Sequence, residues 1–581
     1  MIVSTNELDS RGTPVSGQVK VCCALAILLG LLLLGYCIWI LDRAFEITDE
    51  SYYLLLAIHP ESVMAYNSAQ HWVTSGLWKI SGTLTAFRFA GLSVLLLSAT
   101  VLSIGTLSLI ARSSQVFPVG NLVKYAVISS TWIAAMLYGA TINFSPCYNL
   151  MATAGAYAAL GFAFFAVSQP SKCGIKFLSY SICGTALAIG AISKASAGVA
   201  TLALVLLFIG ACEAGIRARL FGIISVLCGL VVALFVIMLA NTTPNEFVDS
   251  FRLGMFMFRQ VQTEAVPDRL WRYGDEIRGG VYSIIEVFFV PIVLWFLFAN
   301  YKKALLGWSA LCATLFLLVF GGYLLGGVGQ YHKIVSTALL LISLAVVLAY
   351  QFPSFGFNQR LGLVALFDLP YTVAVGSGNS LYTQVIVSLA SWGTLVSILA
   401  IRGSENSEAG PYLLVVWVIF LSALVVQTVS SGFRNPYNLN LPLAKQGYDT
   451  SVAAIGRVKV DQETMRFVAS LNEAVQRCQI KPGRPFLGLY NNPGVALVID
   501  AVPVITPWLN GVEQADTVLA LVDAKTIADA VIGLHVNENG GHAPLPQKIS
   551  DFPDGYTYCG SAVYPWQNRI FQIWIPDGHR V

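Results

Sequence analysis

Two adjacent carboxylates, Asp49 and Glu50, stand directly after the first long apolar run of the chain, in the stretch FEITDESYY over residues 45–53. Two aromatic residues, Tyr52 and Tyr53, follow them at once. A positioned carboxylate can act as a general base toward a hydroxyl group. An acid at the end of a membrane span can also be an ordinary interfacial charge. The sequence leaves both interpretations open until the surrounding elements are placed.

Other ionisable residues gather at the ends of apolar runs rather than in their middles. They are Lys194 in GAISKASAG, Glu286, His332 and Lys333 in GQYHK, and Asp368. A secondary transporter or proton pump usually carries such residues near the membrane midplane. A site at the membrane boundary instead suits a substrate with a lipid tail in the membrane and a polar head at its surface.

The composition identifies the class of protein that must position these residues. Apolar residues make up 56% of the chain and charged residues only 11%, against about a quarter in soluble domains. Apolar runs of roughly 17–25 residues recur, each long enough to span the bilayer as a helix. We therefore expect a polytopic α-helical membrane protein. The net charge of +3 argues against nucleic acid as a partner.

The pattern predicts about thirteen transmembrane helices. They lie near residues 21–41, 84–110, 122–142, 151–168, 178–193, 195–212, 220–240, 281–299, 304–327, 334–350, 358–375, 383–401 and 412–428. Residues 178–212 form one apolar block, which is too long for a single span. Two helices that turn at the small residues around Lys194 account for both the length and the charge.

The distribution of basic residues orients the chain. With the N-terminus in the cytoplasm, every even-numbered connection is basic, as the positive-inside rule requires. These connections carry Arg112 and Lys124, Lys172 and Lys176, Arg217 and Arg219, Lys302 and Lys303, Arg360, and Arg402. Residues 1–428 then form the transmembrane domain, with outer loops at 42–83 and 241–280, and residues 429–581 form a domain outside the cytoplasm.

The outer domain is predicted to be a small α/β domain. Residues 461–478 have the pattern of an amphipathic helix, FLGLY and TVLALVDA of strands or buried segments, and the final stretch from GYTYCG to QIWIP of a hairpin. Cys478 and Cys559 are the only cysteines of this domain, and its compartment permits disulfides. We therefore predict that they pair.

Three short stretches resemble a known family. A first outer loop that opens with TDESYY after one span resembles the GT-C glycosyltransferases, which include the dolichyl-phosphate-mannose protein mannosyltransferases and the bacterial aminoarabinose and O-antigen-modifying transferases. GAISKASAG resembles the lysine-bearing segment of many bacterial members, and FDLPYTVAVGSGN (367–379) a loop of some others. The number of spans and the trailing outer domain are also similar to that group.

The resemblance implies a reaction and its partners. Members transfer a single sugar, usually with inversion, from a polyprenyl phosphate such as undecaprenyl phosphate to an acceptor outside the cytoplasm. The acceptor would be a surface polysaccharide, a lipid-linked glycan or a lipid A-type molecule. It implies a multi-pass protein of the bacterial inner membrane, with the C-terminal domain in the periplasm, that needs no cofactor and binds membrane lipids but no nucleic acid.

The resemblance also implies roles for individual residues. Asp49 would be the general base, and Glu50 would orient it or contact the sugar. Donor-phosphate candidates are Lys194, His332, Lys333 and Arg259, and substrate-pocket candidates are Tyr52, Tyr53, Glu286 and Asn379. Each has an alternative interpretation: solvated acids, a lysine that snorkels at a helix turn, a polar outer loop, or ion pairs among the outer-loop charges.

One departure from the family bears on metal binding. Many members carry a further acid in the outer loop between the third and fourth spans, but here that loop is NFSPCYN (143–149). We therefore expect no metal requirement. Two alternative functions stay open: a lipid-linked glycan polymerase, ligase or oligosaccharyltransferase, which would use an oligosaccharide donor, and a transporter, which would show internal repeats and midplane polar residues.

Overall fold

The computed structural model describes residues 16–282 and 355–577 apart from short gaps, together with a few positions between 335 and 346. The gaps are residues 65, 67, 114–119, 170–172, 262–266, 280, 377, 405–409, 435, 538 and 566–568. The predicted spans near 281–299, 304–327 and 334–350 lie wholly or largely outside the described residues. So do three of the predicted site residues, Glu286, His332 and Lys333.

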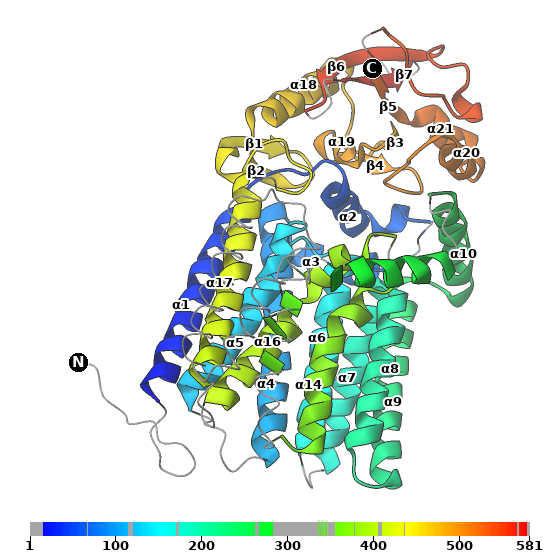
Figure 1. Ribbon diagram of the computed structural model, residues 1–581. Helices are drawn as coiled ribbons and strands as arrows, with labels where there is room; N and C mark the ends of the chain where they lie inside the picture. The colour runs from blue at the N-terminus through cyan, green and yellow to red at the C-terminus, as the bar shows by residue number, and fades with distance from the viewer. Residues whose placement is uncertain are drawn as a thin grey trace.

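Upright helices form a bundle below a smaller domain (Figure 1). They are α1 (Gly17–Ile40), α4 (Leu84–Ser113), α5 (Asn121–Met136), α6 (Tyr148–Ser168), α7 (Cys173–Ser193), α8 (Ala195–Cys212), α9 (Ile216–Asn241), α14 (Phe357–Ala374), α16 (Ala390–Ser404) and α17 (Gly410–Arg434). Within the described residues, eight helices are long and apolar enough to cross a membrane, or nine if the bent pair Leu381–Ser388 and Ala390–Ser404 is one span. All of them coincide with predicted spans. α14 occupies a further predicted span but is not among the eight, and it carries Asp368 and Pro370.

The apolar block at residues 178–212 is divided as predicted. α7 ends at Ser193, α8 begins at Ala195, and Lys194 between them has an extended backbone. Small residues allow the two helices to pack closely. A Cβ atom added at Gly198 would lie 2.5 Å from the Cα atom of Ala191. The length of the block and the small residues within it therefore determine where the chain turns.

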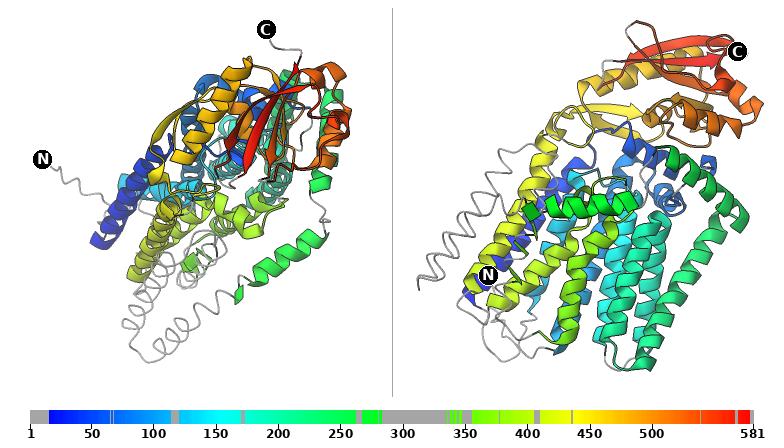
Figure 2. Two further views of the ribbon diagram at one scale, coloured as in Figure 1. Left: turned by 90° about the horizontal axis from the view of Figure 1, so that it is seen from above. Right: turned by 45° about the vertical axis from the view of Figure 1, so that its right-hand side comes forward.

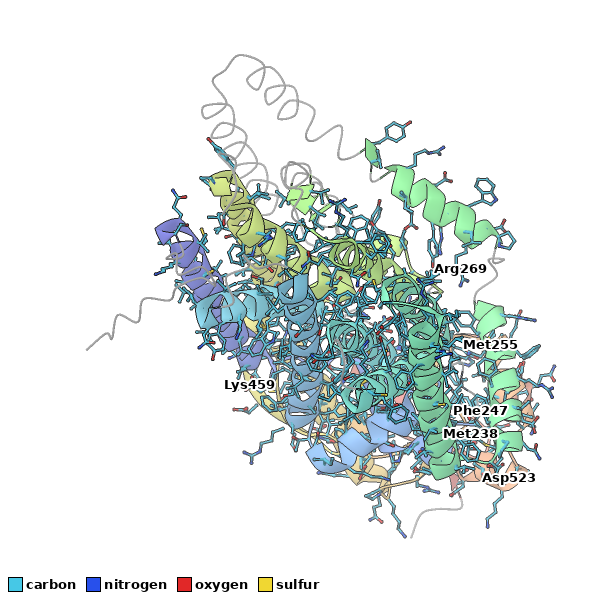
Figure 3. All side chains as sticks on the ribbon, turned by 90° about the horizontal axis from the view of Figure 1, so that it is seen from below. Met238, Phe247, Met255, Arg269, Lys459 and Asp523 are labelled. Atoms are coloured by element: carbon cyan, nitrogen blue, oxygen red, sulfur yellow. A yellow bond between two sulfur atoms is a disulfide. The ribbon has the colours of Figure 1, made fainter. Side chains whose placement is uncertain are left out.

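Short helices join the upright ones. They are α2 (Asp49–Ile58), η1 (Pro60–Ser62), α3 (His71–Ser81), α10 (Pro244–Val261) and α15 (Leu381–Val385) with η3 (Ile386–Ser388), together with a helix over 267–279. Figure 3, seen from the opposite end of the bundle, shows Met238 of α9 and Phe247 and Met255 of α10 along one edge of the molecule. The two predicted outer loops are therefore largely helical.

The C-terminal domain contains two sheets. Strands β1 (Tyr448–Val452) and β2 (Gly456–Val460) pair antiparallel. The second sheet has the order β4-β3-β5-β7-β6. Its strands are β3 (Pro485–Leu489), β4 (Val502–Pro503), β5 (Val531–Val536), β6 (Tyr556–Val563) and β7 (Ile570–Pro576). β3 runs parallel to β4 and β5, and the hairpin β6–β7 completes the sheet antiparallel to β5.

Four helices accompany this sheet: α18 (Gln462–Cys478), α19 (Pro493–Val498), α20 (Val512–Ala520) and α21 (Ala524–Asp529). Figure 2 shows from above how α18 lies along the sheet. A disulfide joins Cys478 at the end of α18 to Cys559 on β6, the pair expected from the sequence. The chain is therefore a multi-pass α-helical membrane protein with a C-terminal α/β domain, as predicted.

For one segment of this domain the strand alternative was wrong, although part of the segment is buried. TVLALVDA was expected to be a strand or buried segment, but it forms the end of α20 and the start of α21. The buried residues Ala515, Val518 and Leu519 follow helical spacing. Asp523 then begins α21 by accepting a hydrogen bond from the backbone N–H of Thr526 at 2.8 Å.

Candidate functional site

The segment that leads into α2 is held on both sides by the C-terminal domain. The backbone N–H of Ala44 donates to the carbonyl of Lys459 at 2.7 Å, and that of Lys459 donates to the carbonyl of Asp42 at 2.8 Å. The N–H of Gly494 donates to the carbonyl of Ile47 at 2.8 Å. A Cβ atom at Gly494 would lie 2.9 Å from the Cα atom of Ile47, so this close approach requires glycine. The backbone just before Asp49 is therefore fixed.

Glu50 is fully buried and paired with Arg88 of α4. Arg88 Nε lies 2.7 Å from Glu50 Oε1, and Arg88 Nη2 lies 2.5 Å from Oε2. The hydroxyl of Ser145 also donates to Glu50 Oε1 at 2.6 Å. Arg88 further donates to the carbonyls of Leu41, Arg43 and Ala44. This arrangement suits a residue that orients its neighbour, and it leaves no part of Glu50 open to a sugar.

Asp49, by contrast, is only partly buried. Its Oδ2 accepts hydrogen bonds from the hydroxyl of Tyr437 at 2.6 Å and from Nδ2 of Asn438 at 3.3 Å. Burial raises the pKa of Asp49 above its ordinary value, and these two hydrogen bonds oppose that shift. Tyr437 and Asn438 follow α17, so the start of the C-terminal region completes the environment of this carboxylate.

A third acid, Glu46, was missed by the sequence analysis although it lies in the same stretch. Its side chain is buried and accepts hydrogen bonds from the backbone N–H of Thr48 at 2.9 Å and of Glu50 at 2.6 Å, and from the hydroxyl of Thr48. It thereby caps the N-terminus of α2. Burial, and next the charge of Asp49, raise the pKa of Glu46 to about 8. The sequence feature that could have identified Glu46 is its position three residues before Asp49 and four before Glu50, which is helical spacing.

Aromatic rings extend from α2 in two directions. The ring centroid of Tyr52 lies 5.6 Å from that of Trp508 in the C-terminal domain and 5.3 Å from that of Tyr53. The ring of Tyr53 in turn lies 5.8 Å from Tyr148 at the start of α6. Burial raises the pKa of Tyr52 to about 12, so its hydroxyl stays neutral. These rings form a continuous wall beside Asp49.

Lys194 lies at the far end of this aromatic wall. Its Nζ is 5.9 Å from the ring centroid of Tyr148, and the residue is 7% exposed. Nζ donates to the carbonyl of Val373 at 2.9 Å, to Oε1 of Gln384 at 3.0 Å and to Oδ1 of Asn149 at 3.5 Å. All three acceptors are neutral. Among the described residues no carboxylate lies within ion-pair distance of Lys194.

The remaining predicted residues that the structure describes lie elsewhere. Asn379 is exposed in the loop before α15. The same loop is tied to the start of α8 because Ser196 Oγ donates to the carbonyl of Val375 at 2.8 Å. Arg259 is exposed on the last turn of α10. The structure therefore brings Asp49, Tyr52, Tyr53 and Lys194 together and leaves Arg259 on the surface.

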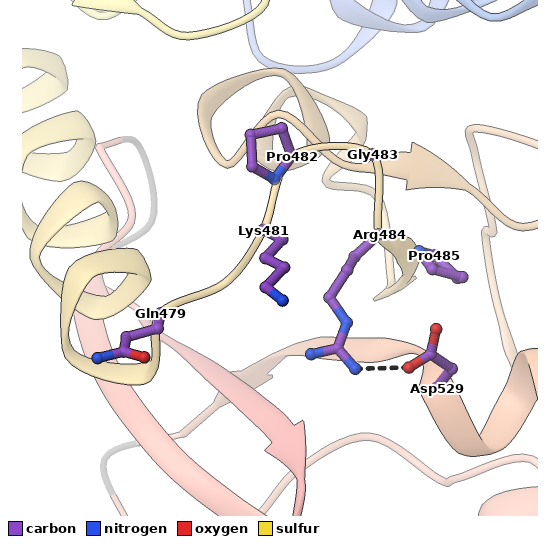
Figure 4. Close-up of a pocket in the computed structure, with 7 residues that line it drawn as sticks. All are labelled: Gln479, Lys481, Pro482, Gly483, Arg484, Pro485 and Asp529. Carbon is purple, nitrogen blue, oxygen red and sulfur yellow. Dashed lines mark hydrogen bonds and ion pairs between the residues drawn. The ribbon is translucent and has the colours of Figure 1, made fainter. Parts of the chain in front are cut away.

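One cavity lies beside these acids, and one cleft lies apart from them in the C-terminal domain. A cavity of about 30 Å³ is lined by Glu46, Glu50, Arg88, Asn143 and Tyr437, among others. A cleft in the C-terminal domain is lined by residues 479–485 and Asp529 (Figure 4), where Arg484 forms an ion pair with Asp529 at 2.5 Å. The charge of Arg484 is thus compensated within the cleft.

No metal site is apparent in the part of the chain that the structure describes. It contains no group of three or more His, Cys, Asp or Glu side chains placed to hold a metal ion. The expectation that the protein needs no metal stays a prediction.

Comparison with known proteins yields structural neighbours only. No family model and no curated protein matches the sequence. The oligosaccharyltransferase AglB from Archaeoglobus fulgidus, solved with an inhibitory peptide and a dolichol-phosphate, has a TM-score of 0.48 at 10% identity, covering 94% of this chain and 80% of that one. ArnT from Cupriavidus metallidurans, bound to undecaprenyl phosphate, has a TM-score of 0.41 at 14% identity, with 94% and 97% covered. These values assign no substrate and no residue role to this chain.

Proposed function

We propose that this protein is an inverting glycosyltransferase that moves a single sugar from a polyprenyl phosphate to an acceptor outside the cytoplasm. The observation that carries the proposal is the placement of two groups of opposite charge, which do not form an ion pair, along one row of aromatic rings. A partly exposed carboxylate, Asp49, and a buried ammonium without an anionic partner among the described residues, Lys194, lie at the two ends of one aromatic wall.

The ammonium group of Lys194 is suited to a lipid phosphate. Buried charges in proteins are normally paired with an opposite charge, since an unpaired one is costly. Arg88 satisfies this rule through Glu50, whereas the described residues offer Lys194 only neutral oxygens. A phosphate at the outer end of α8 would replace the long contact to Asn149 and supply the missing negative charge.

The reaction then follows as one displacement. The acceptor hydroxyl attacks the anomeric carbon while Asp49 takes its proton. The bond from that carbon to the phosphate oxygen breaks, and its electrons stay on the phosphate, where Lys194 stabilises the added charge. Attack opposite to the leaving group inverts the anomeric centre. The ion pair of Glu50 with Arg88 anchors the first turn of α2, which carries Asp49, and Tyr52 and Tyr53 line the pocket.

Other predicted residues keep their proposed roles. His332, Lys333 and Arg259 remain donor-phosphate candidates, and Glu286 and Asn379 remain pocket candidates. The proposed setting is the bacterial inner membrane, with the N-terminus in the cytoplasm and the C-terminal domain outside it.

The test is transfer by purified protein in nanodiscs, with single-sugar undecaprenyl phosphates offered beside an oligosaccharyl pyrophosphate. Asp49→Asn should lower kcat by roughly 10²–10⁴-fold, the usual contribution of a general base. Asp249→Asn, which changes an exposed acid on α10, should leave kcat unchanged. A folded Asp49→Asn variant with near wild-type activity would overturn the assignment, and exclusive use of the oligosaccharide donor would favour the polymerase, ligase or oligosaccharyltransferase alternative.

A further inference from the structure

Three buried polar atoms at the start of α3 have no hydrogen-bond partner within the described protein. They are Gln70 Oε1, His71 Nδ1 and Thr74 Oγ1. Gln70 is 2% exposed, and His71 and Thr74 are each 1% exposed. A buried polar atom without a partner costs roughly 1–3 kcal/mol. Three such atoms in one helical turn therefore call for a partner that the described chain does not supply.

The three side chains share one face of the helix. Residues 70 and 74 are four apart, and residues 71 and 74 are three apart, so they lie on neighbouring positions of the helix surface. Burial lowers the pKa of His71 to about 4. The ring is therefore neutral, and in the tautomer protonated at Nε2 its unpartnered Nδ1 is an acceptor. The cluster presents two acceptors and one hydroxyl.

This cluster lies next to the proposed phosphate ligand. The backbone N–H of Ala69 donates to the carbonyl of Ile192 at 3.1 Å, and the hydroxyl of Ser68 donates to the carbonyl of Ser193 at 2.5 Å. Ser193 directly precedes Lys194. α3 also packs against α2, which carries Asp49. The start of α3 is therefore tied to the residue that precedes Lys194, and α3 itself packs on the helix that begins with Asp49.

We propose that Gln70, His71 and Thr74 form the subsite for the hydroxyl groups of the donor sugar. Gln70 Oε1 and His71 Nδ1 accept hydrogen bonds from sugar hydroxyls, and Thr74 Oγ1 exchanges one with them. Two acceptor atoms repel anionic groups, so the subsite selects a sugar with free hydroxyls and no negative charge at that position. This inference rests on the proposed function and deepens it.

Equilibrium binding to the full chain in nanodiscs tests the proposal with two probes. One is undecaprenyl phosphate, and the other is undecaprenyl phosphate carrying glucose, mannose or arabinose. Thr74→Val removes the hydroxyl at constant shape, and we expect it to weaken binding of a sugar-bearing probe by about 3–10-fold. It should leave undecaprenyl phosphate itself unaffected. Thr74→Ser, which keeps the hydroxyl, is the matched control.

Two further variants separate the possible outcomes. If Thr74→Val folds poorly, Gln70→Met takes its place and should likewise weaken binding of the sugar-bearing probe alone. Lys194→Met should weaken binding of both probes alike. If both subsite variants bind the sugar-bearing probe as the wild type does and change only thermal stability, the cluster holds an enclosed water and the inference is overturned. If the wild type binds neither probe, the proposed function fails together with the subsite.

Discussion

At the scale of single residues, three acids within one turn of chain have three different environments. Glu50 is fully buried against Arg88, Asp49 is partly exposed beside Tyr437, and Glu46 caps a helix. Residue type and adjacency were visible in the sequence, and they identified Asp49 and Glu50. The sequence could not show that Glu50 pairs with a cation while Asp49 bonds a neutral hydroxyl. Their partners, Arg88 and Tyr437, lie 38 and 388 residues away along the chain.

The buried carboxyl of Glu46 should make stability depend on pH. Its pKa is raised from 4.5 to about 8, so the folded protein keeps a proton that the unfolded chain releases in between. Stability is therefore lost as pH rises from about 4.5 to about 8. Glu46→Gln lacks this titration, and its unfolding temperature should exceed that of the wild type by a growing margin across this window.

Thermal unfolding in detergent at pH 5, 6, 7 and 8 measures this effect, which is on the order of a few kcal/mol. Glu61→Gln is the control, because its side chain is 71% exposed. Parallel curves for the wild type and Glu46→Gln would contradict the prediction.

At the scale of elements, Arg88 fastens three of them together. From α4 it reaches Glu50 on α2 and the carbonyls that end α1 and lead out of it. Element boundaries in the membrane were predictable, including the break at Lys194, because bilayer thickness sets the length of a span. The helical state of TVLALVDA was not predictable, since a short apolar run fits a strand and a helix equally well.

Breaking this ion pair should destabilise the protein strongly. Glu50→Gln leaves the Arg88 guanidinium buried without a counter-charge, and we expect a loss of about 3–5 kcal/mol. The double variant Glu50→Gln with Arg88→Met should lose less than the sum of the two single variants, since it removes both charges. Chemical or thermal unfolding of the purified variants measures both, and strictly additive losses would argue against a coupled pair.

At the scale of the whole molecule, the bundle and the C-terminal domain share a hydrophobic core. Phe45, Leu54 and Phe87 from the membrane side pack in one cluster with Phe467 and Val495 from the C-terminal domain. The sequence predicted an outer α/β domain and its cysteine pair, since those are the only two cysteines in it. It could not predict the shared core, because contacts between distant segments leave no periodic pattern.

The disulfide within that domain should contribute measurably to stability. It closes a loop of 81 residues, and Cys478→Ala should therefore lower the free energy of unfolding by roughly 2–4 kcal/mol. Cys228→Ala removes an exposed free cysteine on α9 and should change little. Unfolding of both variants without reductant tests this, and addition of reductant should bring the wild type down to the level of Cys478→Ala.

The hydrogen bonds from Tyr437 and Asn438 to Asp49 have a consequence for biosynthesis. The carboxylate is translated 388 residues before Tyr437. At about 5–20 residues per second, it waits roughly 20–80 s for these partners. During that time the ribosome synthesises all the intervening spans, α17 included. Every nascent chain that stops short of α17 therefore carries Asp49 without Tyr437 and Asn438. The environment of this acid is completed only late in translation.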